Sequence, residues 1–204
     1  MSIAILGGSF NPVHIGHLAL AEDVRLSLGF DRIIFIPAFQ SPFKKTPAGA
    51  TASDRLAMLE SALQENEGFS VDTCELDRGG LSFTIDTIRH VRESYRCTPA
   101  FIMGDDLVKG FPSWKDADEI LRLADIIVAR REGTASRPED FTRLSGARVR
   151  FLSNPVLPVS SSQIRARISA GESWRYLVPE AVYRYISEHK LYGCATTERH
   201  HGKS

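Results

Sequence analysis

The sequence has no excess of either charge, and this absence limits the partners that the protein can have. Its 204 residues include 25 lysines and arginines against 25 aspartates and glutamates, so the formal net charge is zero. Proteins that bind nucleic acids usually carry a clustered basic surplus. We therefore expect no nucleic-acid partner, and any phosphate site must be built locally by a few residues.

Cysteine is also scarce. Cys74, Cys97 and Cys194 are odd in number, widely spaced and without a Cys-x-x-Cys pair. Disulfide frameworks and zinc sites usually show paired, closely spaced cysteines in the sequence. The spacing therefore argues against both, predicts no protein-bound metal and favours a reducing compartment.

Long apolar runs are missing as well. No stretch approaches the roughly 20 apolar residues that a membrane-spanning helix needs. The first residues lead directly into a strand pattern, without the basic and apolar regions of a secretion signal. We expect a cytoplasmic protein with no membrane partner.

What the chain does contain is enough apolar sequence for a sizeable core. Apolar residues make up 43% of it, and its length suits one α/β domain. We expect a single domain over residues 1–193, with a helical C-terminal part at about 160–193. The polar residues 194–204 are expected to form a disordered tail.

Strand and helix patterns alternate along the chain, and this alternation predicts the fold class. Short apolar or alternating runs predict strands at residues 3–6, 31–39, 69–76, 100–103, 126–129 and 149–152. Helical patterns separate most of these runs. The order predicts an α/β fold with a doubly wound parallel sheet, helices on both faces and a small C-terminal helical piece.

The stretch at residues 3–20 carries the clearest chemistry. A buried strand ends in Gly7, Gly8 and Ser9, and a helical pattern begins near His17. Glycines let backbone N–H groups approach a ligand, and a helix start attracts phosphate through its unpaired N–H groups. With His14, which lies three residues before His17, this stretch predicts a phosphate site. A single histidine there would more often cap a turn or pack in the core.

Other polar residues follow predicted strands or begin predicted helices, where open α/β sheets bind ligands. Lys44 and Lys45 lie in a long loop at residues 40–52, although solvated surface lysines explain them equally well. Asp106 follows a strand and can accept ribose hydroxyl protons, or it can cap a helix. The start of the helix near residue 160 has both capping-box spacing and the composition of a phosphate site.

Several of these stretches match known motifs. Residues 7–17, Gly-Gly-Ser-Phe-Asn-Pro-Val-His-Ile-Gly-His, resemble the G-x-F-x-P-x-H-x-G-H signature of the nucleotidyltransferase superfamily, and residues 159–165, Val-Ser-Ser-Ser-Gln-Ile-Arg, resemble its I-S-S-T-x-I-R motif. Further stretches resemble the bacterial nicotinate (nicotinamide) mononucleotide adenylyltransferases. These are residues 80–87, 101–106, 111–115, 126–133 and 177–192.

The resemblance implies a Rossmann-like fold and a set of site residues. It implies that His14, His17 and Arg165 are catalytic. The implied ATP and phosphate contacts are Gly7, Gly8, Ser9, Phe10, His14, His17, Lys44, Gly104, Asp106, Ser161, Ser162 and Arg165. The implied nicotinate contacts are Ser82, Thr84, Trp114 and Lys115. Two residues depart from the family pattern: Phe43 replaces its usual histidine, and Phe83 its usual tyrosine.

The resemblance also implies an activity. It is adenylyl transfer from ATP to nicotinate mononucleotide by direct in-line displacement, giving deamido-NAD and pyrophosphate, with Mg²⁺ bound through the ATP phosphates. Three alternatives remain: phosphopantetheine adenylyltransferase, a cytidylyltransferase and a non-catalytic nucleotide-binding sensor. The sequence leaves open whether the chain forms a homo-oligomer.

Overall fold

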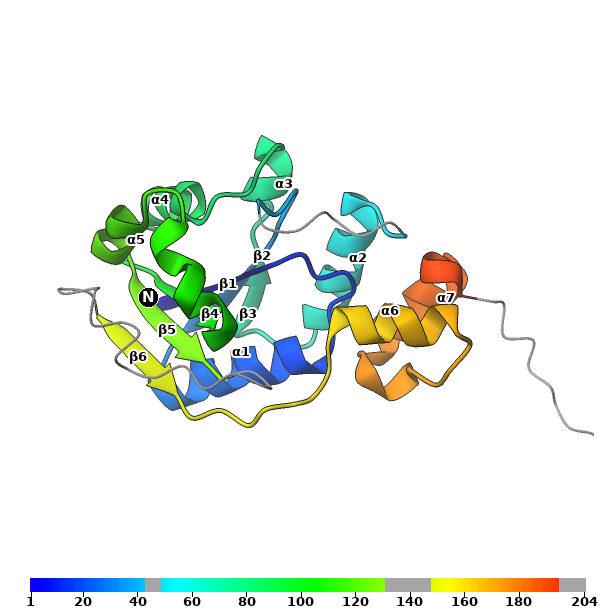
Figure 1. The fold of residues 1–204 in the computed structure, drawn as a ribbon. Coiled ribbons are helices and arrows are strands. Elements are labelled where there is room, and N and C mark those ends of the chain that lie inside the picture. Colours follow the sequence, from blue (N-terminus) through cyan, green and yellow to red (C-terminus); the bar gives the residue numbers. More distant parts are fainter. Residues whose placement is uncertain (43–48, 131–147, 195–204) are drawn as a thin grey trace, which may run out of the picture.

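A parallel β-sheet forms the centre of the computed structural model, which describes residues 1–42, 49–130 and 148–194 (Figure 1). In this part of the chain the sheet has six strands in the order β3-β2-β1-β4-β5-β6. The strands are β1 (Ile3–Gly8), β2 (Arg32–Pro37), β3 (Phe69–Val71), β4 (Ala100–Gly104), β5 (Asp125–Ala129) and β6 (Val149–Leu152). The predicted doubly wound parallel sheet is confirmed.

The strand order places a switch point at the middle of the sheet. The chain moves outward from β1 through β2 to β3, and then returns to pair β4 with the other side of β1, where Leu6 lies opposite Ile102. Connections that leave β1 and β4 in opposite directions open a crevice at their carboxyl ends. Gly8 and Gly104 end these two strands, so the predicted site residues that follow them meet at this edge.

Helices cover both faces of the sheet. They are α1 (Ile15–Leu28), α2 (Ala52–Leu63), α3 (Cys74–Arg78), α4 (Thr84–Tyr95), η1 (Asp105–Ser113), α5 (Ala117–Leu123), α6 (Ser161–Ser169), η3 (Arg175–Leu177), α7 (Glu180–Glu188) and η4 (Leu191–Gly193). In Figure 1, α4 and α5 lie on one side of the sheet and α1 on the other, while α6 and α7 lie beyond α2.

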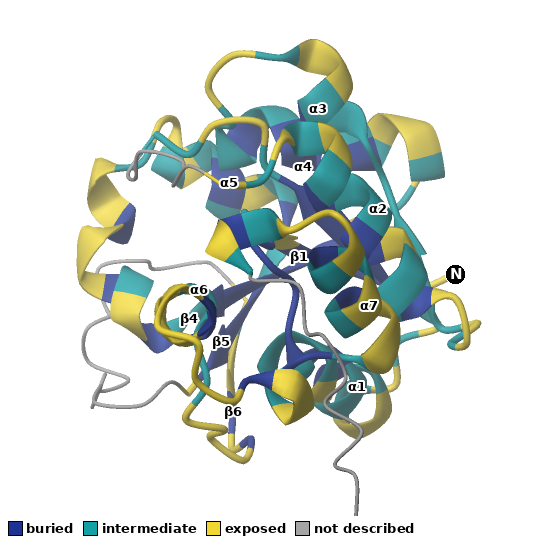
Figure 2. Cartoon of the chain, turned by 90° about the vertical axis from the view of Figure 1, so that its right-hand side faces the viewer, coloured by how far each residue is buried: buried dark blue, intermediate teal, exposed yellow. Residues whose placement is uncertain are grey.

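Alternation along β1 explains how both faces are filled. Ala4 and Leu6 belong to the core cluster under α1 and α2, whereas Ile3 and Ile5 belong to the cluster under α4 and α5. Successive side chains of a strand point to opposite faces, and burial of each aliphatic side chain contributes about 1.5–3 kcal/mol. Figure 2 shows the central strands largely in dark blue, among helices that carry many exposed residues.

The C-terminal helices share the first of these two cores. Ile164 of α6 and Val182 and Ile186 of α7 are fully buried in the cluster that also contains residues of α1 and α2. This packing places α6 against the loop that follows β1, although the two segments lie about 150 residues apart in the sequence. The same packing therefore builds the candidate site.

The structure corrects some predicted boundaries. The strand expected at residues 69–76 ends at Val71, because the Asp72 Oδ1 atom accepts the Cys74 N–H at 2.9 Å and the chain turns into α3. Thr51 caps α2. In α1, Leu26 is 64% exposed. Gly29 ends α1 in the left-handed conformation. Among the described residues, no helix is long and apolar enough to span a membrane.

Candidate active site

The loop between β1 and α1 is fixed from below by a buried arginine. Arg55 of α2 is only 2% exposed, and its Nη1 atom donates to the Ser9 carbonyl oxygen at 2.7 Å. Burial lowers the pKa of Arg55, but a guanidinium keeps its charge in proteins. A fixed positive charge therefore lies beside the loop residues that follow Gly8.

The two predicted histidines lie together at the start of α1. His14 is the N-cap residue and His17 lies in the first turn, with 3.7 Å between the two ring centroids. The His14 backbone N–H donates to His17 Nδ1 at 3.2 Å. Because a backbone N–H can only donate, Nδ1 carries the lone pair. In the neutral ring the proton is then on Nε2, which becomes a hydrogen-bond donor.

Position 16 needs a glycine, because the chain that leads into α6 lies close to the start of α1 here. A Cβ atom at this position would lie 2.9 Å from a methyl group of Val159 and 3.1 Å from the His14 ring. Both contacts are closer than side chains normally tolerate. The glycine thus allows Val159, two residues before α6, to pack closely against the start of α1.

Helix α6 brings the second predicted motif to the same loop. Ser160 caps it, with Gln163 in a reciprocal capping box. The Ser161 hydroxyl donates to the Pro12 carbonyl oxygen at 2.9 Å. The Arg165 Nη1 atom donates to the Asn11 carbonyl oxygen at 2.6 Å, and its Nη2 atom to the Ser162 hydroxyl at 3.1 Å. The phosphate-site and capping-box interpretations of this helix start are therefore compatible.

A tyrosine near the end of the described chain adds a further hydrogen bond to this loop. The Tyr192 hydroxyl donates to Asn11 Oδ1 at 2.6 Å, and the residue is 7% exposed. Burial raises the pKa of Tyr192 far above the usual range, so the hydroxyl stays a donor. Sequence reasoning missed Arg55, Tyr192 and the side-chain role of Asn11. An arginine three residues before Met58 and four before Leu59, on the apolar face of a helix, is the signal that could have identified Arg55.

The predicted nicotinate contacts form a second group at the carboxyl end of β4. Trp114 packs its ring against Phe101 of β4 and Phe111, with centroid distances of 6.1 and 5.1 Å. Lys115 donates to Asp86 at 3.1 Å and lies 4.6 Å from the centre of the Phe83 ring. These contacts join the tryptophan to the first turn of α4.

Thr84 begins α4, and within the described chain no side chain caps this helix. The backbone donors of its first turn are of the kind that receive a carboxylate. The neighbouring Ser82 has a structural task, because its hydroxyl accepts the Phe39 N–H at 3.0 Å and its own N–H donates to the Gln40 carbonyl oxygen. Ser82 thus ties the start of α4 to the end of β2.

The remaining predicted residues are placed unevenly. Gly104 ends β4 and Asp106 is the second residue of η1, at the same edge as Gly7 and Gly8. Phe10 is 2% exposed and packs against His17 and Phe35. Its side chain is therefore part of the core, which leaves only its backbone to meet phosphate. Lys44 and Lys45 lie outside the described residues, as do the other residues of their predicted loop from 43 to 48.

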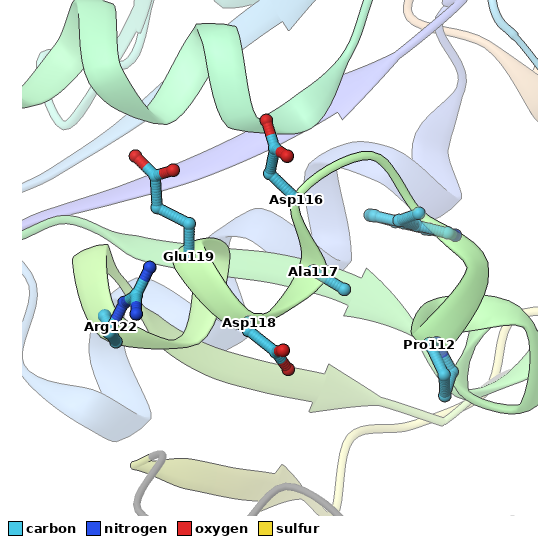
Figure 3. A pocket seen from close by; sticks show the side chains of 7 residues that line it. Pro112, Asp116, Ala117, Asp118, Glu119 and Arg122 are labelled. Atoms are coloured by element: carbon cyan, nitrogen blue, oxygen red, sulfur yellow. The ribbon is translucent and has the colours of Figure 1, made fainter.

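Two hollows flank the site and differ in charge. One of about 340 Å³ lies beside Trp114 and α5 (Figure 3); its charged lining residues are Asp116, Asp118, Glu119 and Arg122. Three carboxylates against one guanidinium make it unsuitable for a nucleotide phosphate. The other, of about 580 Å³, adjoins Ser162 and Arg165 and includes Lys190. The described residues that line this second hollow include no carboxylate, so it suits an anion.

Comparison with known proteins identifies the family. Residues 5–167 match the cytidylyltransferase-like family model. A Treponema pallidum protein named "Probable nicotinate-nucleotide adenylyltransferase" is 39% identical over 202 residues, covering 94% of this chain and 99% of the relative. A Bordetella avium protein of the same name is 39% identical over 194 residues, covering 93% and 97% of the two chains.

A solved structure agrees in fold. The Plasmodium falciparum nicotinic acid mononucleotide adenylyltransferase complexed with NaAD superposes with a TM-score of 0.77, covering 95% of this chain and 98% of the other. At 16% identity this likeness bears on the fold alone. Together with the sequence relatives, these findings show that the chain belongs to the cytidylyltransferase-like family and, within it, to the nicotinate-nucleotide adenylyltransferases, a group of nucleotidyltransferase enzymes.

Proposed function

We propose that the protein transfers the adenylyl group of ATP to nicotinate mononucleotide, giving deamido-NAD and pyrophosphate. The observation that carries this proposal is the convergence of two distant motifs. His14 and His17 begin one helix, and Ser162 and Arg165 begin another, while hydrogen bonds from Ser161 and Arg165 hold α6 against the carbonyls of Pro12 and Asn11. The names of the curated relatives support the same activity.

In the proposed mechanism, a phosphate oxygen of nicotinate mononucleotide attacks the α-phosphorus of ATP in line with the departing pyrophosphate. One P–O bond forms and the bond to the β-phosphate oxygen breaks. The nucleophile is already anionic, so no general base or covalent enzyme intermediate is needed. The residues act by alignment and by stabilising charge on the transferred and leaving groups.

His17 has the geometry for this role. Its Nδ1 atom is engaged by the His14 backbone N–H, so Nε2 is the ring's donor toward a phosphate oxygen. Arg165, with one amino group on the Asn11 carbonyl, adds a fixed positive charge at the same loop. Arg55 adds a second positive charge beneath it, through the Ser9 carbonyl. Such preorganised donors stabilise developing charge without reorganising.

The donor set at this loop consists of imidazole, guanidinium and hydroxyl groups, which suits phosphate oxygens better than a hard cation. We therefore propose that Mg²⁺ enters bound to the phosphates of ATP and to water. In that form the ion would supply positive charge that offsets the negative charge of the pyrophosphate. No residue of the chain is assigned as its ligand.

We propose that the choice between nicotinate and nicotinamide mononucleotide depends on the protein groups around Trp114 and Thr84. An indole face stacks on a pyridine ring with about 0.5–1.5 kcal/mol beyond burial, whichever substituent the ring carries. The first-turn N–H groups of α4 are donors only, so they match a carboxylate and leave a carboxamide NH₂ unpaired. An unpaired buried donor costs about 1–3 kcal/mol, which predicts a preference of roughly 10- to 100-fold for nicotinate over nicotinamide mononucleotide in kcat/KM.

A pyrophosphate-release assay with ATP tests the proposal. Nicotinate mononucleotide, nicotinamide mononucleotide and phosphopantetheine are compared as acceptors, and CTP is compared with ATP as the donor. Trp114→Ala is expected to weaken both pyridine acceptors by a similar factor. Faster turnover of phosphopantetheine or of CTP would favour another member of the superfamily. Nucleotide binding without turnover of any pair would favour the sensor.

A further inference from the structure

A cluster of three potential metal ligands lies on the β3 side of the sheet, apart from the residues assigned to the nucleotide. The carboxylate of Asp72, the thiol of Cys74 and the imidazole of His90 place one ligand atom each within 4.8 Å of the others. Asp72 follows β3, Cys74 begins α3 and His90 lies on α4. We propose that these three side chains bind a borderline-soft divalent metal ion, with zinc the favoured ion.

The ligand types select this ion. Thiolate and imidazole are preferred by Zn²⁺ and its neighbours among the transition metals, whereas Mg²⁺ and Ca²⁺ prefer oxygen. In a tetrahedral zinc site with bonds of about 2.0–2.3 Å, the ligand atoms lie about 3.3–3.8 Å apart. The His90 Nε2 atom is already 3.1 Å from Asp72 Oδ2. Small side-chain rotations would therefore form the site, with water as the fourth ligand.

Neighbouring groups hold the carboxylate in position, as hydrogen-bond partners of metal ligands do in known metal sites. Asp72 Oδ1 accepts the Cys74 N–H at 2.9 Å, and Asp72 Oδ2 accepts the Tyr95 hydroxyl at 3.2 Å. The Asp72 side chain is 11% exposed, while that of His90 is 38% exposed. The site is thus ordered on one side and open to an entering ion on the other.

The local charge favours a cation. A thiol binds a metal ion as the thiolate, so the Cys74 proton is released when the ion binds. A thiolate, a carboxylate and a neutral imidazole then carry a charge of −2, which one divalent ion balances. The sequence argument against zinc considered only cysteine spacing, and the fold adds His90 and Asp72.

A bound ion would join two elements near the proposed acceptor site. It would link the start of α3 to the middle of α4, where Glu75 and Thr87 are already hydrogen-bonded to each other. Helix α4 begins at Thr84. Because the ion binds the folded chain and not the unfolded one, its expected effect is a rise in thermal stability.

Cobalt(II) is the probe, because a thiolate ligand gives it a charge-transfer band in the near ultraviolet. The chelator-treated full chain is titrated with Co²⁺ and then with Zn²⁺. We expect one Co²⁺ per chain, a thiolate band, displacement by Zn²⁺ and a Zn²⁺-dependent rise in Tm. Cys74→Ser should abolish the band, and His90→Gln should weaken Co²⁺ binding at least tenfold.

Two control variants separate this site from other ligands on the chain. Cys97→Ser removes another partly buried cysteine, and the double variant His200→Gln, His201→Gln removes the histidine pair near the end of the sequence. Both should bind Co²⁺ as the wild-type chain does. The proposal is wrong if the wild-type chain gives no thiolate band, or if the band persists in Cys74→Ser. Should Cys74→Ser fail to fold, an unchanged Co²⁺ affinity and Zn²⁺-dependent Tm rise in folded His90→Gln would equally overturn it.

Discussion

At the scale of single residues, His17 carries the sharpest expectation. Its Nδ1 atom accepts the His14 backbone N–H, so in the neutral ring Nε2 carries the proton that can be donated to a phosphate oxygen. Removing one such donor typically costs about 10²- to 10³-fold in kcat. His17→Ala should therefore lose activity on this scale in steady-state assays while its circular dichroism stays unchanged.

The matched control for His17 is His189→Ala, which removes an exposed histidine near the end of α7. It should keep wild-type turnover. If His17→Ala retained more than half of the wild-type kcat, the assignment of His17 to transition-state stabilisation would be rejected, although the family membership would stand.

Single residues also mark the limit of what the sequence could predict. His14, His17 and Arg165 belong to short local motifs, so the resemblance of these motifs to a known family was enough to predict their roles. Arg55 and Tyr192 act through contacts with Ser9 and Asn11, which lie 46 and 181 positions away. No local pattern contains such a contact. It exists only once α2 and the C-terminal helices pack on the same face of the sheet.

At the scale of elements, two helix caps provide a matched pair. Ser160 caps α6 and Thr51 caps α2, each in a reciprocal capping box. Replacing either residue by alanine should cost about 0.5–2 kcal/mol of stability in urea unfolding. Ser160→Ala is expected to raise the KM for ATP more than Thr51→Ala does, because α6 carries Ser162 and Arg165 at the loop itself, whereas α2 reaches the loop only through Arg55 and the Ser9 carbonyl. Equal KM values for ATP in the two variants would show that the residues at the start of α6 do not contribute to ATP binding.

Elements were predicted best where the pattern was long and apolar. The strand at residues 149–152 was predicted with its observed bounds, and the buried runs that became β1, β2, β4 and β5 were all found within a few residues. The end of β3 was wrong because a side chain decided it: Asp72 accepts the Cys74 N–H and turns the chain. Propensity alone does not contain such local competition between side chain and backbone.

At the scale of the whole molecule, carboxylates connect elements that lie far apart in the sequence. Asp54 of α2 accepts the Tyr185 hydroxyl of α7, Glu119 of α5 pairs with Arg89 of α4, and Asp31 accepts the Ser2 N–H. Each of these carboxyl groups has a lowered pKa. Hydrogen bonds lower it for Glu119 and Asp31, and for Asp54 hydrogen bonds from Thr51 and Tyr185 outweigh the opposing effect of burial.

The direction of these shifts fixes the pH dependence of stability. A carboxyl group with a lowered pKa in the folded state stabilises the fold at every pH above its unfolded pKa of about 4. This stabilisation is lost as the pH falls through the folded pKa. The free energy of unfolding, measured with urea, should therefore fall below about pH 4.

Asp54→Asn tests the contribution of the link between α2 and α7. The variant keeps the shape of the side chain but cannot ionise, so it should be less stable than the wild-type chain by on the order of 1 kcal/mol at pH 7. The gap should close as the pH falls, because the wild-type carboxyl group then becomes neutral too. Glu65→Gln, at an exposed position after α2, is the control and should run parallel to wild type. A gap for Asp54→Asn that stays constant down to pH 2 would show that its cost comes from packing and not from charge.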